Sequence, residues 1–281
     1  MQPDKEVITR WNNSAQFWEK HREVIRQMFA PVAQALIDDA KIGAGQTVLD
    51  VATGPGEPAL SVAELVGPEG KVVGVDPIPR MIEGGRRAAN RLGLKNVKFE
   101  VAHADRLPFS DATFDSAISR FGIMFFPSPL EGIREMLRVL KPEGKLAFAV
   151  WCSVERNPFH SVLSQILDRL VEPTPPAPDA PDAFRFASPG KLLRILSEAG
   201  VPAPTERVLQ FKIEAAVSAE EFCVLRGEMS ESFHKKLATL SPHQSAEVKH
   251  LALNSFRKYS TDGGMSFPAE VLIVSGAKSR K

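Results

Sequence analysis

Short apolar runs alternate with segments of helical periodicity through the middle of this chain. The apolar runs predict strands at residues 48–51, 71–75, 97–101, 114–119 and 145–151. Between them, apolar residues recur at three- and four-residue steps and predict helices at residues 57–65, 80–92 and 129–140. This alternation predicts an α/β fold in which right-handed crossovers join parallel strands. Ligands of such folds bind at the carboxyl ends of the strands.

The N-terminal region is predicted to differ from this α/β core. Residues 1–45 form a helical segment, because apolar residues that include Trp11 and Trp18 recur at helical spacing before the first strand. Two interpretations of these tryptophans remain open. They pack in the core of the domain, or they belong to a lid over a bound ligand.

Beyond residue 151 the regular alternation stops. A proline-rich stretch at residues 172–178 excludes regular structure, and further strands are predicted at residues 207–214 and 269–275. Between these strands, a capping box at Ser218 and a second helix start at Ser241 predict a helical insertion over residues 218–259. The α/β domain then comprises residues 46–217 and 260–281. The insertion is either a cap over the substrate or a contact between subunits.

The amino-acid composition argues against several classes of function. The 281 residues carry a formal net charge of +1, with Lys and Arg scattered, so no surface for nucleic acid or an anionic membrane is expected. The two cysteines, Cys152 and Cys223, are far apart and indicate neither a disulfide framework nor a metal site. The N-terminus has no signal-like apolar region. We therefore expect a cytoplasmic protein, and its oligomeric state is not predicted.

A glycine turn follows the first predicted strand. Gly54, Gly56 and Ala59 fit the pattern G-x-G-x-x-G/A, which allows close approach of a ligand and aims helix N–H groups at an anion. Such a turn also occurs for packing alone. However, Asp76 ends the next strand, 20 positions after Gly56, where a carboxylate can bind both ribose hydroxyls. Together these features predict a nucleoside-binding domain.

Two further blocks carry a family resemblance. Residues 102–115 read AHADRLPFSDATFD, and residues 138–144 read RVLKPEG. With the glycine turn, these blocks resemble the class I S-adenosylmethionine-dependent methyltransferases, in particular the ubiquinone and menaquinone biosynthesis type. The resemblance covers residues 46–151 in detail. It implies a Rossmann-like, doubly wound sheet of seven strands with an antiparallel last strand, to which this chain adds the helical cap insertion.

The resemblance also implies a set of residues around the cofactor, S-adenosylmethionine. The turn from Asp50 to Gly56 would hold its methionine end, with Ala52 in place of the usual first glycine. His103 stands where the family has Asp or Asn beside the adenine, so either His103 or Asp105 is expected there. The implied cofactor-binding residues are Asp50, Ala52, Thr53, Gly54, Gly56, Asp76, Pro77, Met81, His103, Ala104, Asp105, Arg120 and Phe121.

The sequence says less about the residues that bind the substrate than about those that bind the cofactor. Arg120 is interpreted as a ligand for the substrate or for the cofactor carboxylate, or as a surface salt bridge. Phe121, Phe125 and Phe126 would line an apolar pocket or pack in the core. His160 is the histidine expected nearest the cleft, but methyl transfer needs a base only when the nucleophile must lose a proton, so no catalytic residue is named. The expected partner is a small, partly apolar methyl acceptor.

Two other functions fit parts of the sequence. Gly54, Gly56, Ala59 and Asp76 also match a nicotinamide dinucleotide fingerprint, but the two family blocks and the long N-terminal helical segment disfavour a dehydrogenase. A cofactor-binding protein without turnover is the second alternative. The departures at Ala52 and His103 are the features that favour it.

Overall fold

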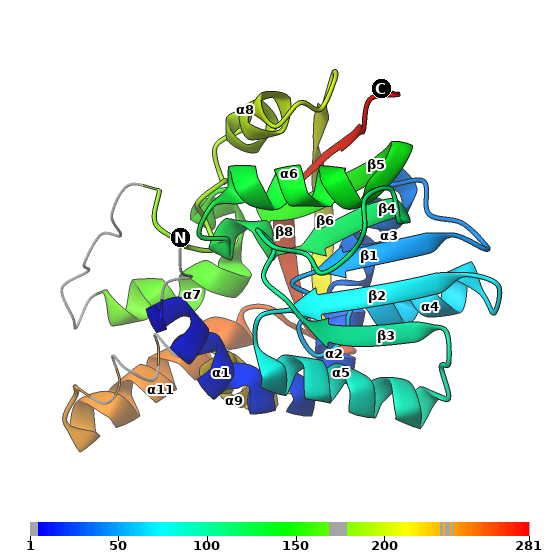
Figure 1. Cartoon of the computed structure of the whole chain (residues 1–281). Coiled ribbons are helices and arrows are strands. Elements are labelled where there is room, and N and C mark those ends of the chain that lie inside the picture. The colour runs from blue at the N-terminus through cyan, green and yellow to red at the C-terminus, as the bar shows by residue number, and fades with distance from the viewer. Residues whose placement is uncertain (1–4, 169–178, 231–232, 234–236, 238, 281) are drawn as a thin grey trace.

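The computed structural model describes residues 5–168, 179–230, 233, 237 and 239–280, and they build one mixed sheet with helices on both faces (Figure 1). The proline-rich stretch at residues 172–178 lies outside the described residues, as does part of the predicted insertion. No described helix is long and apolar enough to cross a membrane.

The sheet has the strand order β3-β2-β1-β4-β5-β8-β6, and the short β7 pairs with β8. The five strands from β3 to β5 are parallel, whereas β8 runs antiparallel to both β5 and β6. The predicted seven-stranded sheet with an antiparallel last strand is thus confirmed, with β7 added. The strands are β1 (Thr47–Val51), β2 (Lys71–Asp76), β3 (Val97–Val101), β4 (Phe114–Arg120), β5 (Leu140–Trp151), β6 (Thr205–Ala215), β7 (Ser260–Thr261) and β8 (Gly264–Ala277).

Helices cover both faces of the sheet because the central strands are apolar on both sides. Val48 and Leu49 of β1 are fully buried, as the run of apolar residues predicts. Figure 1 shows α3 and α4 behind the sheet and α6 in front of it. The helices that pack on the sheet include α2 (Arg22–Met28), α3 (Ala30–Asp39), α4 (Ala59–Val66), α5 (Pro79–Leu92), α6 (Pro129–Val139) and α8 (Lys191–Glu198).

Four helices gather at the carboxyl ends of the parallel strands, on the left of Figure 1. They are α1 (Lys5–Lys20), α7 (Pro158–Leu167), α9 (Ala219–Met229) and α11 (Pro242–Arg257). Capping boxes at Ser218 and Ser241 start α9 and α11, as the sequence predicts. The insertion and the N-terminal segment therefore meet over the same edge of the sheet, where α9 packs against both α1 and α11.

Aromatic side chains fix the position of the insertion. Phe222 of α9 stacks on Phe267 of β8 with ring centroids 4.8 Å apart, and Phe256 of α11 lies 5.2 Å from Phe222. Phe159 of α7 contacts both Phe222 and Phe267. Because Phe159, Phe222, Phe256 and Phe267 are at most 2% exposed, this cluster anchors α7, α9 and α11 to the sheet.

Candidate functional site

A cavity of about 360 Å³ lies where the carboxyl ends of β1, β2, β4 and β5 face α1, α7 and α9. All but two of the predicted cofactor-binding residues line it, together with the side chains of Trp11 and Trp18 from α1. The exceptions are Asp50 and Gly56. The cavity is large enough for a ligand of cofactor size.

The glycine turn has the backbone conformation that its sequence suggests. Gly54 and Gly56 have positive φ angles of 57° and 111°. A Cβ on Gly56 would lie 2.9 Å from the Leu60 side chain and 3.2 Å from the Gly85 backbone, so a larger residue would have to displace both and would be strained at this φ. Ala52 also has a positive φ, 61°, which explains why glycine is usual at this position. The helix after the turn begins at Ala59, two residues later than predicted.

Asp50 supports the turn from behind the cavity. Its Oδ2 accepts hydrogen bonds from the Thr53 hydroxyl at 2.6 Å and from the Ala59 backbone N–H at 3.1 Å. Burial raises the pKa of Asp50 to about 7. Asp50 is fully buried and does not line the cavity. Its carboxylate therefore stabilises the turn by hydrogen bonds rather than lining the cavity.

Asp76 ends β2 and faces the cavity. Its Oδ2 accepts a hydrogen bond from the Gly54 N–H at 3.0 Å, and its Oδ1 accepts one from the Ile78 N–H at 3.0 Å. Burial raises the pKa of this carboxyl to about 6, although both N–H groups favour the charged form. Each oxygen keeps further acceptor capacity, so the carboxylate can still bind ribose hydroxyls. Pro77 and Met81 line the cavity beside it.

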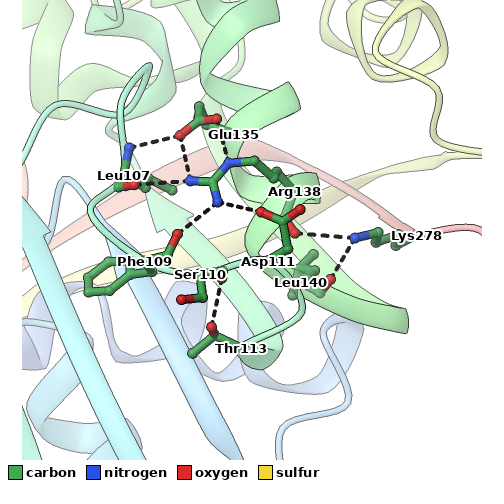
Figure 2. Close-up of polar contacts among 9 residues, drawn as sticks. All are labelled: Leu107, Phe109, Ser110, Asp111, Thr113, Glu135, Arg138, Leu140 and Lys278. Carbon is green, nitrogen blue, oxygen red and sulfur yellow. Dashed lines mark hydrogen bonds and ion pairs between the residues drawn. The ribbon is translucent and has the colours of Figure 1, made fainter.

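The loop that carries His103, Ala104 and Asp105 is held by one arginine of α6 (Figure 2). The Arg138 guanidinium donates to the Leu107 and Phe109 carbonyl oxygens at 3.0 and 2.7 Å and to the Asp111 carboxylate at 2.8 Å. It also pairs with Glu135, whose Oε2 accepts from the Leu107 N–H at 2.9 Å. This network gives the two family blocks a physical reason to occur together.

Arg120 points inward from the end of β4. Its Nη2 donates to the Glu57 carbonyl oxygen at 3.1 Å, and its guanidinium carbon lies 5.8 Å from the Phe29 ring centroid. Burial lowers its pKa, partly offset by Glu57 and Asp50. Since Arg120 forms none of the ion pairs found among the described residues, the surface salt bridge interpretation is wrong. The next residue, Phe121, has a positive φ of 59° and also lines the cavity.

Aromatic rings form the other end of the cavity. Phe121 stacks on Trp151 at 4.4 Å between centroids, and Phe29 lies edge-on to Phe121 at 5.3 Å. Phe125 and Phe126 line the same space. His160 sits edge-on to Trp151 at 4.6 Å, which confirms its expected place in the cleft. This end of the cavity suits an apolar ligand.

A sequence profile for a family described as "Methyltransferase domain" matches residues 42–200, more than half of the chain. The chain belongs to this family. The predicted resemblance to the class I S-adenosylmethionine-dependent methyltransferases is thus confirmed.

Named relatives of this chain are methyltransferases of quinones. Demethylmenaquinone methyltransferase of Listeria welshimeri is 39% identical over 107 residues, which cover 38% of this chain and 45% of that protein. The ubiquinone/menaquinone biosynthesis C-methyltransferase UbiE of Marinomonas sp. is 37% identical over 134 residues, covering 47% and 52%. The chain thus spans about half the length of the curated relatives it matches.

Solved structures share the fold across nearly the whole chain. The YcgJ protein from Bacillus subtilis has a TM-score of 0.58 and 21% identity, covering 89% of this chain and 98% of that one. The [4+2]-cyclase SpnF has a TM-score of 0.55 and 18% identity, covering 96% of each chain. Because a cyclase shares the fold, the reaction of this protein has to be argued from its site.

Sequence reasoning missed several residues of the site. Arg10 and Arg22 of the N-terminal segment, Phe29, and Arg226 of α9 all line the cavity. The spacing of Arg226 in the sequence could have identified it. It follows Phe222 by four residues and precedes Met229 by three, so it lies on the apolar face of its helix.

Proposed function

We propose that this protein transfers a methyl group from S-adenosylmethionine to a small, partly apolar molecule with an oxygen, carbon or nitrogen nucleophile. One observation carries the proposal. The turn at Gly54, bonded to the Asp76 carboxylate, and the aromatic end around Trp151 open into the same cavity. A polar nucleoside site beside an apolar space is the arrangement that such a transfer requires.

The residues of this chain suit the parts of the cofactor. Ala52, Thr53 and Gly54 would bind its methionine end, Asp76 its ribose, and Pro77 and Met81 its adenine. At the adenine edge, His103 and Asp105 both line the cavity, and either can accept from the amino group. When bound, S-adenosylmethionine supplies a methyl group on a positively charged sulfur, whose departure leaves a neutral thioether.

The protein's contribution is alignment and exclusion of water. Phe29, Phe121 and Trp151 provide ring faces that attract a cation and keep water from the reacting atoms. We infer that the N-terminal segment acts as a lid, since Trp11 and Trp18 line the cavity. The insertion would act as the substrate cap, since Arg226 and Met229 of α9 face the same space.

The chemical class of the methyl acceptor is also part of the proposal. The named relatives are quinone methyltransferases, so a reduced demethylmenaquinone is one acceptor to try. The cavity is apolar at its aromatic end and the chain has a net charge of only +1, which favours a small molecule over a nucleic acid. We propose that the protein works as a soluble cytoplasmic enzyme.

Calorimetric titration tests the cofactor first. S-adenosylmethionine should bind with micromolar affinity to the wild type, and Asp76→Ala should weaken it at least about tenfold, because the mutant loses the ribose acceptor. Asp262→Ala, an exposed change outside the cavity, serves as the control. Binding of NADH in place of S-adenosylmethionine would overturn the proposal.

Turnover is tested separately by the formation of S-adenosylhomocysteine with candidate acceptors. Acceptor-dependent formation supports transfer. Tight cofactor binding with no product from any acceptor in a broad panel of phenols, quinols, amines and acids would favour the alternative of a binding protein without turnover.

A further inference from the structure

Arg226 is a buried arginine for which no described residue supplies a hydrogen bond or an ion pair to the side chain. Arg226 is 7% exposed and lines the cavity, and its Nε atom is buried without a hydrogen bond. Within the part of the chain that the structure describes, Arg226 forms no ion pair. Since buried charges are normally paired, this arginine needs an explanation.

The groups around Arg226 do not neutralise it. Its guanidinium carbon lies 3.9 Å from the Phe159 ring centroid, and the neighbouring His160 also has a buried Nε2 without a hydrogen bond. Burial lowers the pKa of Arg226 to about 10, so it remains a cation at neutral pH. Burial and the nearby Arg226 lower the pKa of His160 well below its usual range, so its ring is neutral.

The carboxylates that line the cavity have no ion pair with Arg226. They belong to Glu57, Asp76, Asp105 and Asp182. Three of them already accept hydrogen bonds elsewhere: Glu57 from Ser61, Asp76 from Gly54 and Ile78, and Asp182 from the Phe184 N–H. The cavity therefore presents a cation and a neutral imidazole with unused hydrogen-bonding capacity.

The position of this pair separates it from the cofactor turn. Arg226 lies on Phe159, and Phe159 packs near Trp151 at the end of β5. The glycine turn follows β1, two strands away across β4, which corresponds to about 10 Å. Arg226 and His160 thus belong to the aromatic end, where the acceptor would bind.

We infer that the methyl acceptor carries a carboxylate, which pairs with the Arg226 guanidinium and accepts a hydrogen bond from His160 while its apolar body lies against Trp151. The inference rests on the proposed function and narrows its acceptor class to small aromatic or aliphatic acids, which excludes a reduced demethylmenaquinone because that molecule has no carboxylate. One planar guanidinium fork matches one carboxylate in a bidentate pair. A buried cation kept without a partner is consistent with a site that sacrifices stability for binding.

Tryptophan fluorescence measures the binding directly, because all three tryptophans, Trp11, Trp18 and Trp151, line the cavity. The probes are benzoate, phenylacetate and cinnamate, each compared with its uncharged amide at saturating S-adenosylhomocysteine. The best acid should bind about tenfold or more tighter than its amide. Arg226→Gln should abolish this preference, and Arg226→Lys should retain part of it.

Two controls make the result specific. Arg10→Gln removes another arginine of the same cavity, whose Nη2 is also buried without a hydrogen bond. Arg257→Gln removes the exposed ion pair between α11 and Glu220 of α9, which tests the integrity of the insertion. Both variants should keep the preference for the acid.

Three results would overturn the inference. They are equal binding of acids and amides, no saturable binding of any acid up to about 10 mM, or loss of the preference in Arg10→Gln with retention in Arg226→Gln.

Arg226→Met controls for misfolding. Replacing an unpaired buried charge by an apolar side chain of similar length should raise the melting temperature. Calorimetry with S-adenosylhomocysteine keeps the two proposals apart. A protein that binds it but shows no acid preference refutes only the carboxylate.

Discussion

The backbone N–H of Gly54 donates a hydrogen bond to the Asp76 carboxylate across 3.0 Å, which ties the turn after β1 to the end of β2. The second oxygen of the same carboxylate accepts from the Ile78 N–H. One side chain therefore fixes two backbone segments at the end of the cavity where we propose that the cofactor binds. The residue expected to bind ribose is also a structural clamp.

Replacing Asp76 by Asn should separate these two functions. The amide oxygen can accept from Gly54 or Ile78, but its NH₂ group then faces the other N–H, so one bond is lost. We expect at least about tenfold weaker S-adenosylmethionine binding with only a small net change in the free energy of unfolding at neutral pH, because removal of a buried charge offsets the lost hydrogen bond. Urea unfolding and calorimetry measure the two effects. Unchanged affinity in the variant would contradict a role for Asp76 at the ribose.

Asp50 should make the stability of the ligand-free protein depend on pH. Its pKa is raised from 3.8 to about 7 in the folded state, so the folded protein binds its proton more tightly than the unfolded chain. The stabilisation is therefore complete below about pH 4 and is lost as the pH rises through 7. Between pH 5 and 8 the wild type should lose about 2–3 kcal/mol relative to Asp50→Asn. Chemical unfolding of both proteins at each pH measures the difference, and a constant difference would refute it.

The Arg138 network should couple stability to cofactor binding (Figure 2). Arg138→Met removes the bonds to the Leu107 and Phe109 carbonyls, so the loop that carries His103 loses its support. We expect a loss of about 2–3 kcal/mol in unfolding free energy and weaker S-adenosylmethionine binding. Arg134→Met, on the same helix and paired among the described residues only with exposed Glu131, is the matched control and should change neither. Equal effects of the two variants would argue against the network.

Ala52 should tolerate glycine better than a larger residue. A left-handed φ costs an L-residue about 1–2 kcal/mol, so Ala52→Gly should raise stability by up to about 1 kcal/mol after the entropy of the unfolded glycine is counted. Ala52→Val should lower stability and S-adenosylmethionine affinity, because a β-branched side chain opposes positive φ and Gly122 lies against the Ala52 methyl group. Ala112→Gly, at a φ of 54° outside the cavity, should reproduce the stability gain alone.

Local patterns in the sequence were sufficient for most of the fold. The alternation of apolar runs and helical periodicity predicted the parallel strands, because each element buries its own apolar face. The capping residues Ser218 and Ser241 marked the starts of α9 and α11, because the cap satisfies N–H groups within the next turn. The turn at Gly54 and the carboxylate at Asp76 pointed to the nucleoside end, because both sit at fixed positions relative to their strands.

Tertiary packing decided the direction of individual side chains. Asp50 lies within the turn that was expected to hold the cofactor, yet its carboxylate is buried beneath Thr53 and Ala59. Arg120 turns inward rather than toward solvent. Successive side chains of a strand point to opposite faces of the sheet. Whether a given polar side chain lines a cavity depends on which helices and loops pack on that face.

The sequence by itself determined the α/β core and the family, and it predicted most of the residues that line the cavity near Gly54 and Asp76, since these depend on short-range patterns. The surroundings of Arg226, where we propose that the acceptor binds, were decided only in three dimensions. Arg226 and His160 are 66 residues apart, and they meet because the aromatic cluster of Phe159, Phe222 and Phe267 docks α9 on α7 and β8. Contacts of this kind depend on how apolar surfaces fit together across the whole chain, which no local pattern records.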